Sequence, residues 1–280
     1  MEIKNQIGVG LRSTHYPHIE KSLSSQKRLN VDWFEAVSEN YMDTRGRPFE
    51  ILSKVREHYP VALHGVSLSI ASFHEPSQNY LKRLKSLVDV IDPFIVSDHL
   101  CWTGVNHKNM HDLLPFPLNS ESFEIVSRNV ETVQAYLKRP LLLENVSAYL
   151  LFKENTYTEA QFLSELSKKT GCKVLLDLNN IYVNASNFNQ SAQKYIEELD
   201  AKNIGQIHLG GPSDTGKFLF DTHSCEPPQA VLDLLTTQAE KYDTIPVLIE
   251  WDMDVPSFAV MESQVERTKS AISKGLCNTL

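Results

Sequence analysis

Short apolar runs of strand length alternate with longer amphipathic stretches along most of the chain. This alternation is typical of βα units, in which helices cover a buried parallel sheet. The apolar runs predict eight strands, over residues 7–12, 33–39, 61–70, 94–100, 141–146, 173–179, 205–211 and 247–251. The helical patterns cover residues 49–59, 78–91, 120–138, 158–170, 189–201, 227–242 and 255–274. The first connection, 14–30, has the least regular pattern.

Proline marks several of the predicted helix-to-strand junctions. Because proline cannot continue a helix, it is well placed between a helix and the strand that follows. The junction residues are Pro60, Pro93, Pro140 and Pro246. Eight βα units in 280 residues predict a (β/α)8 barrel, a fold of about 250 residues, and we expect one domain over residues 1–280.

The alternative architecture is a doubly wound open sheet with a nucleotide-binding glycine motif. Gly8 and Gly10 lie inside the first predicted strand, and no third glycine follows at the required spacing. The phosphate-binding pattern Gly-x-Gly-x-x-Gly is therefore absent, which favours the barrel.

The composition narrows the class of protein. With 27 basic and 35 acidic residues the formal charge is -8, which disfavours binding to nucleic acid. No stretch resembles a signal peptide or approaches the ~20 apolar residues of a membrane span. The cysteines (Cys101, Cys172, Cys225 and Cys277) form no Cys-x-x-Cys pair. We expect a cytoplasmic protein with reduced thiols, no membrane association and no nucleic-acid partner.

Six consecutive predicted strands carry a His, Asp or Glu at or near their carboxyl ends. Because the carboxyl ends of barrel strands surround one mouth, these side chains should meet there. They are His64, His99, Glu144, Asp177, His208 and Glu250, and Asp221 and His223 follow the seventh strand. Such residues are depleted in buried strands, so their recurrence predicts a shared chemical role.

Buried carboxylates that converge on one mouth repel one another unless cations compensate them. Imidazole and carboxylate ligands without thiolate suit zinc, manganese or iron. The set contains more ligand-type side chains than one ion uses, so we expect two or three ions. Glu144, near the middle of the set, is the expected bridge between them.

Other polar residues near the strand ends are candidates for a substrate pocket: His15, Glu39, Asn40, Asp98 and Asn145. His111 lies in a long loop after the fourth strand, where it is expected to contact substrate or belong to a lid. The remaining histidines, His18, His58, His74 and His107, are expected at the surface. Cys101 and Trp102 are expected to pack in the core.

An ordered series of motifs contains these residues and runs through almost the whole chain. The motifs are Glu39-Asn40-Tyr41, Leu63-His64-Gly65, Ser97-Asp98-His99-Leu100, His111-Asp112-Leu113-Leu114-Pro115, Leu143-Glu144-Asn145-Val146, Leu176-Asp177-Leu178-Asn179-Asn180, Ile207-His208-Leu209-Gly210-Gly211, Asp221-Thr222-His223 and Ile249-Glu250-Trp251-Asp252. The series resembles the multinuclear non-haem iron-dependent oxidative enzymes, a family that includes the iron subunit of the methanobactin synthase.

The resemblance implies a xylose-isomerase-like barrel that holds two or three irons. It implies two irons bound by His64, His99, Glu144, Asp177, His208 and Glu250, with Glu144 bridging, and a third bound by Asn180, Asp221 and His223. It also implies O2-dependent modification of cysteine in a ribosomally synthesised precursor peptide, whose leader a separate partner protein presents. Asp252 and His111 are the candidate catalytic residues for proton transfer.

Two other functions remain open from the residues. One is a divalent-metal hydrolase or isomerase on the same barrel, such as a tri-zinc apurinic endonuclease of the endonuclease IV type or a sugar isomerase. The charge of -8 is unfavourable for the nuclease. The other is a scaffold that only sequesters iron or docks a partner.

Overall fold

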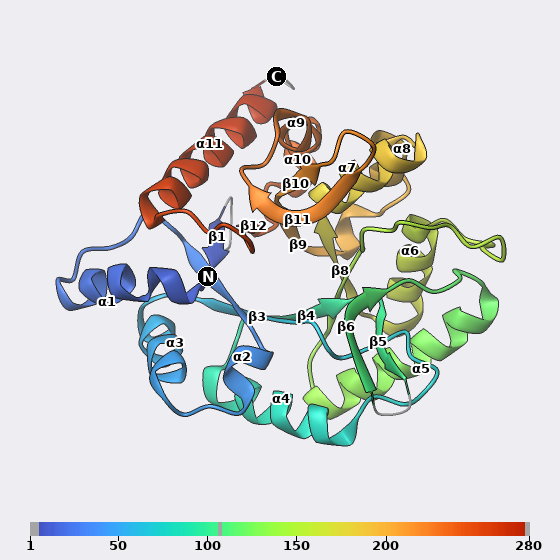
Figure 1. Cartoon of the computed structure of the whole chain (residues 1–280), viewed down its shortest axis with the longest axis horizontal. Helices are drawn as coiled ribbons and strands as arrows, with labels where there is room; N and C mark the ends of the chain where they lie inside the picture. The colour runs from blue at the N-terminus through green and yellow to red at the C-terminus, as the bar shows by residue number, and fades with distance from the viewer. Residues whose placement is uncertain (1–5, 106–107, 278–280) are drawn as a thin grey trace.

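The computed structural model describes residues 6–105 and 108–277. Eight parallel strands close a barrel in the order β1-β12-β9-β8-β7-β4-β3-β2, which confirms the predicted fold. The barrel strands are β1 (Ile7–Gly10), β2 (Trp33–Val37), β3 (Val61–Gly65), β4 (Ile95–His99), β7 (Leu142–Glu144), β8 (Lys173–Asp177), β9 (Ile204–Leu209) and β12 (Val247–Ile249). Figure 1 shows the helices around the outside of this barrel.

The helices are α1 (Tyr16–Ser24), α2 (Glu39–Met42), α3 (Arg47–His58), α4 (Gln78–Ile91), α5 (Ser120–Leu137), α6 (Glu159–Thr170), α7 (Leu178–Phe188), α8 (Ala192–Glu197), α9 (Gln229–Thr237), α10 (Ala239–Tyr242) and α11 (Phe258–Cys277). Several of them begin at side-chain caps, which satisfy backbone N–H groups that a helix start leaves free. Ser77 caps α4, Asn119 caps α5 and Thr158 caps α6. These helices lie within a residue or two of their predicted ranges.

The barrel interior has an apolar floor below a polar layer. One buried cluster contains an inward-facing residue from each of six strands: Trp33, Ala62, Ile95, Leu142, Leu175 and Leu248. Residues two apart on a strand share a face. Two positions further along the same strands stand Glu35, His64, Ser97, Glu144, Asp177 and Glu250, all buried. The polar side chains thus lie directly above the buried apolar floor of the barrel.

On strand β1, Gly8 has no side chain and so leaves room in this floor for the Trp33 ring. A Cβ atom at Gly8 would lie 2.3 Å from the indole ring of Trp33. The glycine therefore lets Trp33, which is fully buried, fill the centre of the barrel end. This packing closes the barrel below the polar layer, so the layer is approached from the carboxyl ends of the strands.

The prediction for residues 173–201 was wrong in part. Strand β8 ends at Asp177, and α7 begins at the next residue, where a strand had been expected to continue to residue 179. The helix expected over 189–201 is replaced by α7 and the short α8, and Asn189 ends α7 in a left-handed conformation with φ 52°. The side chain of Asp177 caps α7 by accepting from the Asn180 N–H, and this cap starts the helix early.

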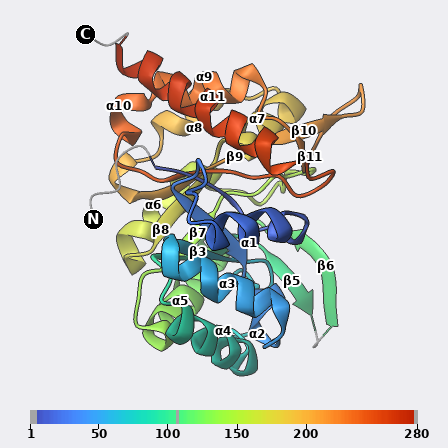
Figure 2. The same cartoon turned by 90° about the vertical axis from the view of Figure 1, so that its left-hand side faces the viewer.

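Two hairpins that the sequence analysis did not predict follow β4 and β9. They are β5 (Trp102–Val105) with β6 (Lys108–Leu114), and β10 (Gly211–Asp214) with β11 (Leu219–Cys225). Figure 2 shows both hairpins on the right-hand side of the barrel. Because they continue from the carboxyl ends of barrel strands, this side is the mouth.

Three other boundaries differ from the prediction. Helix α1 lies in the connection 14–30, the predicted helix 227–242 is divided into α9 and α10, and the last helix runs over Phe258–Cys277. Among residues 6–105 and 108–277, no helix is both long and apolar enough to cross a membrane. The cysteines are all free, and Cys101 is buried in the core as expected.

Candidate metal centre

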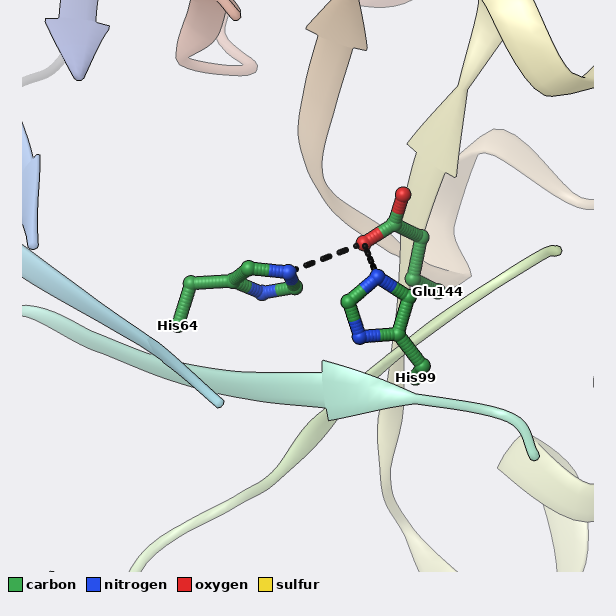
Figure 3. Close-up of side chains that lie close together, drawn as sticks. All are labelled: His64, His99 and Glu144. Carbon is green, nitrogen blue, oxygen red and sulfur yellow. Dashed lines mark ion pairs between the residues drawn. The ribbon is translucent and has the colours of Figure 1, made fainter. Parts of the chain in front are cut away.

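The first group of ligand-type side chains joins β3, β4 and β7. The Nε2 atoms of His64 and His99 lie 3.2 and 3.4 Å from the same Oε2 atom of Glu144, as Figure 3 shows. His99 Nδ1 donates to the carbonyl oxygen of Gly65 over 3.1 Å, and His64 Nδ1 lies 2.9 Å from the Ser97 hydroxyl. With Nδ1 engaged in this way, each ring turns its Nε2 lone pair towards Glu144.

A second group shares Glu144 with the first. Glu144, Asp177, His208 and Glu250 are buried, and one ligand atom of each lies within 4.8 Å of the others. His208 Nδ1 is 2.9 Å from Glu250 Oε2, and it is 4.0 Å from both Glu144 Oε1 and Asp177 Oδ2. One carboxylate therefore stands between two sets of ligand atoms, as the sequence predicts for Glu144.

A third group lies nearer the mouth and shares Glu250 with the second. It consists of His223, Glu250 and Asp252. His223 Nε2 also lies 3.2 Å from Asp221 Oδ1 and 3.4 Å from Asp177 Oδ2. The family resemblance implies that His223 binds with Asp221 and Asn180; in the structure Asp252 Oδ2 also lies 3.9 Å from His223 Nδ1.

Close backbone packing holds the His223 ring. A Cβ atom at Gly210 would lie 1.8 Å from Cδ2 of His223, so only glycine admits the ring at this position. His223 itself has a φ of 43°, in the left-handed region that side chains rarely adopt. The hairpin β10–β11 thus bends so that His223 enters the barrel mouth.

The start of α7 positions Asp177 and Asn180. Asp177 Oδ1 accepts from the Asn180 N–H over 2.6 Å, which leaves Oδ2 directed at the cluster. Asn145 supports the same turn, because its amide exchanges hydrogen bonds of 2.8 and 3.0 Å with the Asp177 backbone. Asn180 Nδ2 donates to the Asn145 carbonyl over 3.0 Å. Asn145, predicted to line a substrate pocket, instead orders the strand end behind the ligands.

Several polar atoms in these groups have no hydrogen-bond partner among the described residues, although they are buried. They are Glu144 Oε2, Asp177 Oδ2, Asn180 Oδ1 and His223 Nε2. Such atoms are rare in proteins because each costs free energy to bury. Their convergence fits a site for cations, and the His and carboxylate donors fit zinc, manganese or iron.

The histidines of the ligand groups differ in the direction in which their pKa is shifted. Burial, reinforced by His208, lowers the pKa of both His64 and His99, which keeps these rings neutral and able to bind a metal. Burial alone would lower the pKa of His223, but Asp221 and Glu250 raise it well above its ordinary value.

The carboxyl groups respond in opposite ways. Burial raises the pKa of Glu144 well above its usual range. Burial also raises the pKa of Asp221, to about 6. Burial opposes ionisation of Glu250 as well, but His223 and His208 outweigh it and hold the pKa of that group well below its usual range.

Three predicted pocket residues do not face the cluster. Asp98 alternates with His99 on β4, so its side chain points out of the barrel, where it accepts from the Leu68 N–H over 3.1 Å. Glu39 accepts from the Val66 N–H and the Tyr80 hydroxyl. Asn40 is exposed on α2. These three side chains therefore lie outside the ligand groups.

The remaining histidines are spread over the surface or outside the cluster. His15 is buried, with Nε2 at 2.8 Å from the Pro256 carbonyl oxygen and its ring against Phe258. His111 is exposed on β6, and no contact of the described residues joins it to the ligand groups. The exposed set is His18, His58 and His74, as predicted, whereas His107 lies outside the described residues.

Three residues of the polar interior were missed by the sequence analysis. Arg12 reaches the mouth from β1 and pairs with Asp252, with Glu250 3.9 Å away. Glu35 and Gln206 lie below His208. The signal was present, because Glu35 follows Trp33 by two residues and Gln206 precedes His208 by two residues, so alternation places each pair on one face.

The family model for "RiPP precursor modification enzyme MbnB/TglH/ChrH" matches residues 6–273 of the chain. The chain belongs to this family. The match confirms the resemblance found from the motifs, and it identifies a family of enzymes that modify precursors of ribosomally synthesised and post-translationally modified peptides. Relatives similar to this MbnB/TglH/ChrH family member include UPF0276 proteins of Caulobacter vibrioides and Anaeromyxobacter sp. The first is 42% identical over 96% of this chain and 94% of its own, and the second is 44% identical over 93% and 90%.

Solved structures similar to this MbnB/TglH/ChrH family member share its fold at low sequence identity. An L-ribulose 3-epimerase matches 98% of this chain and 95% of its own, with a TM-score of 0.61 and 16% identity. Endonuclease IV from Thermus thermophilus matches 96% and 99%, with a TM-score of 0.60 and 13% identity. These similarities confirm the xylose-isomerase-like barrel.

Proposed function

We propose that this protein is a multinuclear iron-dependent oxidase or oxygenase that uses O2 to modify cysteine residues of a ribosomally synthesised precursor peptide. One observation carries the proposal: three groups of His and carboxylate ligands, joined by Glu144 and Glu250, line the mouth of a barrel from a peptide-modifying family. Shared carboxylates are suited to adjacent ions, and iron held by His and carboxylate ligands is a metal that can react with O2.

The ligand groups suggest where the ions would bind. His64, His99 and Glu144 would hold one ion, and Glu144, Asp177, His208 and Glu250 would hold a second. For a third, the family resemblance implies Asn180, Asp221 and His223, and Asp252 lies within reach of the same ring. The buried atoms without partners, such as Asp177 Oδ2, support this assignment. Bound iron would supply the activation of O2 and the redox equivalents.

The protein's own groups would orient the substrate and move protons. Asp252, 41% exposed, is held at the mouth by Arg12 and lies 3.9 Å from His223 Nδ1. This position suits a group that exchanges protons with a substrate entering the mouth. For His111, exposed on the β5–β6 hairpin at the mouth, we propose contact with the incoming peptide.

The mouth also has a surface suited to a peptide or its carrier. Tyr149, Leu150 and Leu151 are exposed in the loop after β7, and Phe218 and Phe220 are exposed on the β10–β11 hairpin. The Tyr149 and Phe220 rings lie 5.3 Å apart, so the two segments meet. Exposed apolar patches of this kind mark interaction sites. We assign this surface to a cysteine-containing precursor peptide and a leader-binding partner protein, in the cytoplasm.

Elemental analysis and Mössbauer spectroscopy of anaerobically purified protein, followed by mass spectrometry of a co-expressed cysteine-bearing peptide, test the proposal. We expect two or three irons per chain and a change in peptide mass that requires O2. His64→Ala should abolish the change, whereas the matched control His58→Ala alters an exposed histidine and should not. Full occupancy by zinc or manganese with turnover unaffected by anaerobiosis would instead support a hydrolase or isomerase. Iron binding without any peptide modification would support a scaffold.

A further inference from the structure

The His208 ring is held at both edges. Nδ1 faces the carboxylates of the second ligand group, with Glu250 Oε2 at 2.9 Å. Nε2 faces the opposite way, towards the barrel floor. It lies 2.8 Å from Gln206 Nε2, which can donate to it while it carries no proton, and 3.2 Å from Glu35 Oε1, which can accept its proton once it carries one. Only Nδ1 is therefore directed at the place where the second ion would bind.

Glu35 comes from the other side of the barrel. It lies on β2, and β1 and β12 stand between β2 and β9, which carries His208. Its second oxygen accepts a hydrogen bond of 2.5 Å from Gln206 Nε2. Glu35 is 6% exposed, and Gln206 and His208 are fully buried. Three polar side chains thus form a connected unit immediately above the apolar floor.

Burying the Glu35 carboxylate at this position costs free energy. Burying a charge in a barrel interior costs several kcal/mol unless it is paired. Among the ion pairs of the described residues, Glu35 takes part in one, and its partner is His208. No described Lys or Arg pairs with it, so the cost is offset through the His208 imidazole and the hydrogen bond from Gln206. Packing does not require the charge, because the floor below is apolar.

The two histidines of the first ligand group have weaker outer partners. His64 Nδ1 lies against the Ser97 hydroxyl, and His99 Nδ1 donates to the Gly65 carbonyl. A carboxylate partner does more than a neutral one, because it accepts the imidazole N–H strongly and makes the opposite nitrogen a better metal ligand. His208 differs from both in directing Nδ1, the nitrogen nearer the backbone, at its ligand group.

We infer that Glu35 is a positioning residue: when His208 binds the second metal ion through Nδ1, its ring proton stands on Nε2, and Glu35 Oε1 is the oxygen that accepts it. Gln206 Nε2 holds Glu35 in place through its hydrogen bond to Oε2. The inference rests on the metal-binding part of the proposed function. It adds Glu35 and Gln206, neither of which is a metal ligand, as residues that set the affinity of the second ion site.

Co2+ is a suitable probe, because its visible absorption reports on each site without any turnover. Titration of metal-free protein with Co2+ against a competing chelator gives the affinity and the number of ions. Loss of an outer partner typically costs about 10–100-fold in metal affinity. We expect such a loss at one site in Glu35→Ala, a smaller loss in Glu35→Gln, which keeps an acceptor for the Nε2–H, and a loss of a few-fold in Gln206→Ala. The first site should keep its affinity in all three.

Controls separate this role from a structural one. Ser97→Ala removes the outer partner of His64 and should weaken the other site. Glu159→Gln changes a carboxyl that accepts from the Val146 N–H and the Tyr195 hydroxyl but contacts no ligand side chain, and it should weaken neither. Circular dichroism and thermal unfolding of the metal-free variants check the fold, and Gln206→Ala keeps the test open should a Glu35 variant fail to fold. In the zinc-loaded wild type, 15N NMR should show His208 protonated at Nε2.

The outcomes are distinguishable. Folded Glu35 and Gln206 variants that bind every Co2+ equivalent with wild-type affinity would overturn the inference and leave the proposed function intact. A wild-type protein that binds neither Co2+ nor Fe2+ would overturn the proposed function itself.

Discussion

Replacing Glu144 by glutamine should raise the stability of the metal-free protein while it removes most of the stabilisation by metal. Glu144 is buried in the same group as Asp177 and Glu250, so its charge is repelled there. Glutamine has the same shape without the charge. Its amide nitrogen would face the Nε2 acceptors of His64 and His99, which now lie 3.2 and 3.4 Å from Oε2.

The size of the two effects follows from the contacts. Relief of a poorly compensated buried charge, with the amide hydrogen-bonded, is worth about 1–3 kcal/mol. One kcal/mol shifts the unfolding midpoint of a chain of this size by about 2 °C, so we expect a rise of about 2–6 °C without metal. Metal at about 100 times its dissociation constant stabilises by about 2.7 kcal/mol per site. Two sites that share Glu144 then add about 10 °C in the wild type, and the variant should lose most of this gain.

Thermal unfolding followed by circular dichroism, under anaerobic conditions with and without Fe2+, measures both effects. The stability order of wild type and Glu144→Gln should reverse when iron is added. Glu159→Gln is the matched control, because it also removes a buried carboxyl but should leave the iron-dependent rise unchanged. A variant that is less stable than wild type without metal, yet gains as much from Fe2+, would refute the bridging role of Glu144.

Three further predictions follow from single contacts. Burial raises the pKa of Glu159 to about 7, above its unfolded value. The free energy of unfolding should therefore fall as the pH rises from about 5 to 7, by an amount on the order of 1–3 kcal/mol. Urea titrations at each pH measure this fall, and Glu159→Gln should flatten it. Gly210→Ala should displace the His223 ring and lower the iron content by about one ion per chain, with two-ion content as the expected remainder in elemental analysis. Asp177→Asn should keep the cap of α7 and the stability of the fold, but it should lose metal affinity. Asp177→Ala should lose the metal affinity and also lower the free energy of unfolding by a further ~1 kcal/mol. Equal unfolding midpoints for the two metal-free variants would contradict the capping role.

The barrel could be predicted because its strands are buried on both faces. Such strands appear in the sequence as apolar runs, and the helices between them have clear caps at Ser77, Asn119 and Thr158. The two hairpins could not, since most of β6 is exposed and its residues show no apolar alternation. Helix α7 was misplaced because its start depends on the Asp177 cap, which was interpreted only as a metal ligand.

The ligand groups were predictable for a related reason. A polar residue at the end of an apolar run stands out, and the barrel directs all such residues to one mouth. The sequence could not show which neighbours turn inward with them. Asp98 is adjacent to His99 and faces outward, whereas Glu35 lies in the middle of a predicted strand and faces inward. Alternation along each strand separates these cases once one inward residue per strand is known.

The histidines imply an order in which the sites take up metal. Burial keeps His64 and His99 neutral, so the first site is ready to bind at or below neutral pH. Burial opposes protonation of His208 too, but Glu35 and Glu250 raise the pKa of this residue well above its ordinary value, and metal must displace its Nδ1 proton. Metal uptake should therefore release a proton from His208 at the second site and none from the histidines of the first, in addition to any proton lost by Glu144, which belongs to both sites. Titrations with Zn2+ in buffers of different ionisation enthalpy measure this release, and an equal release at both sites would contradict the assignment.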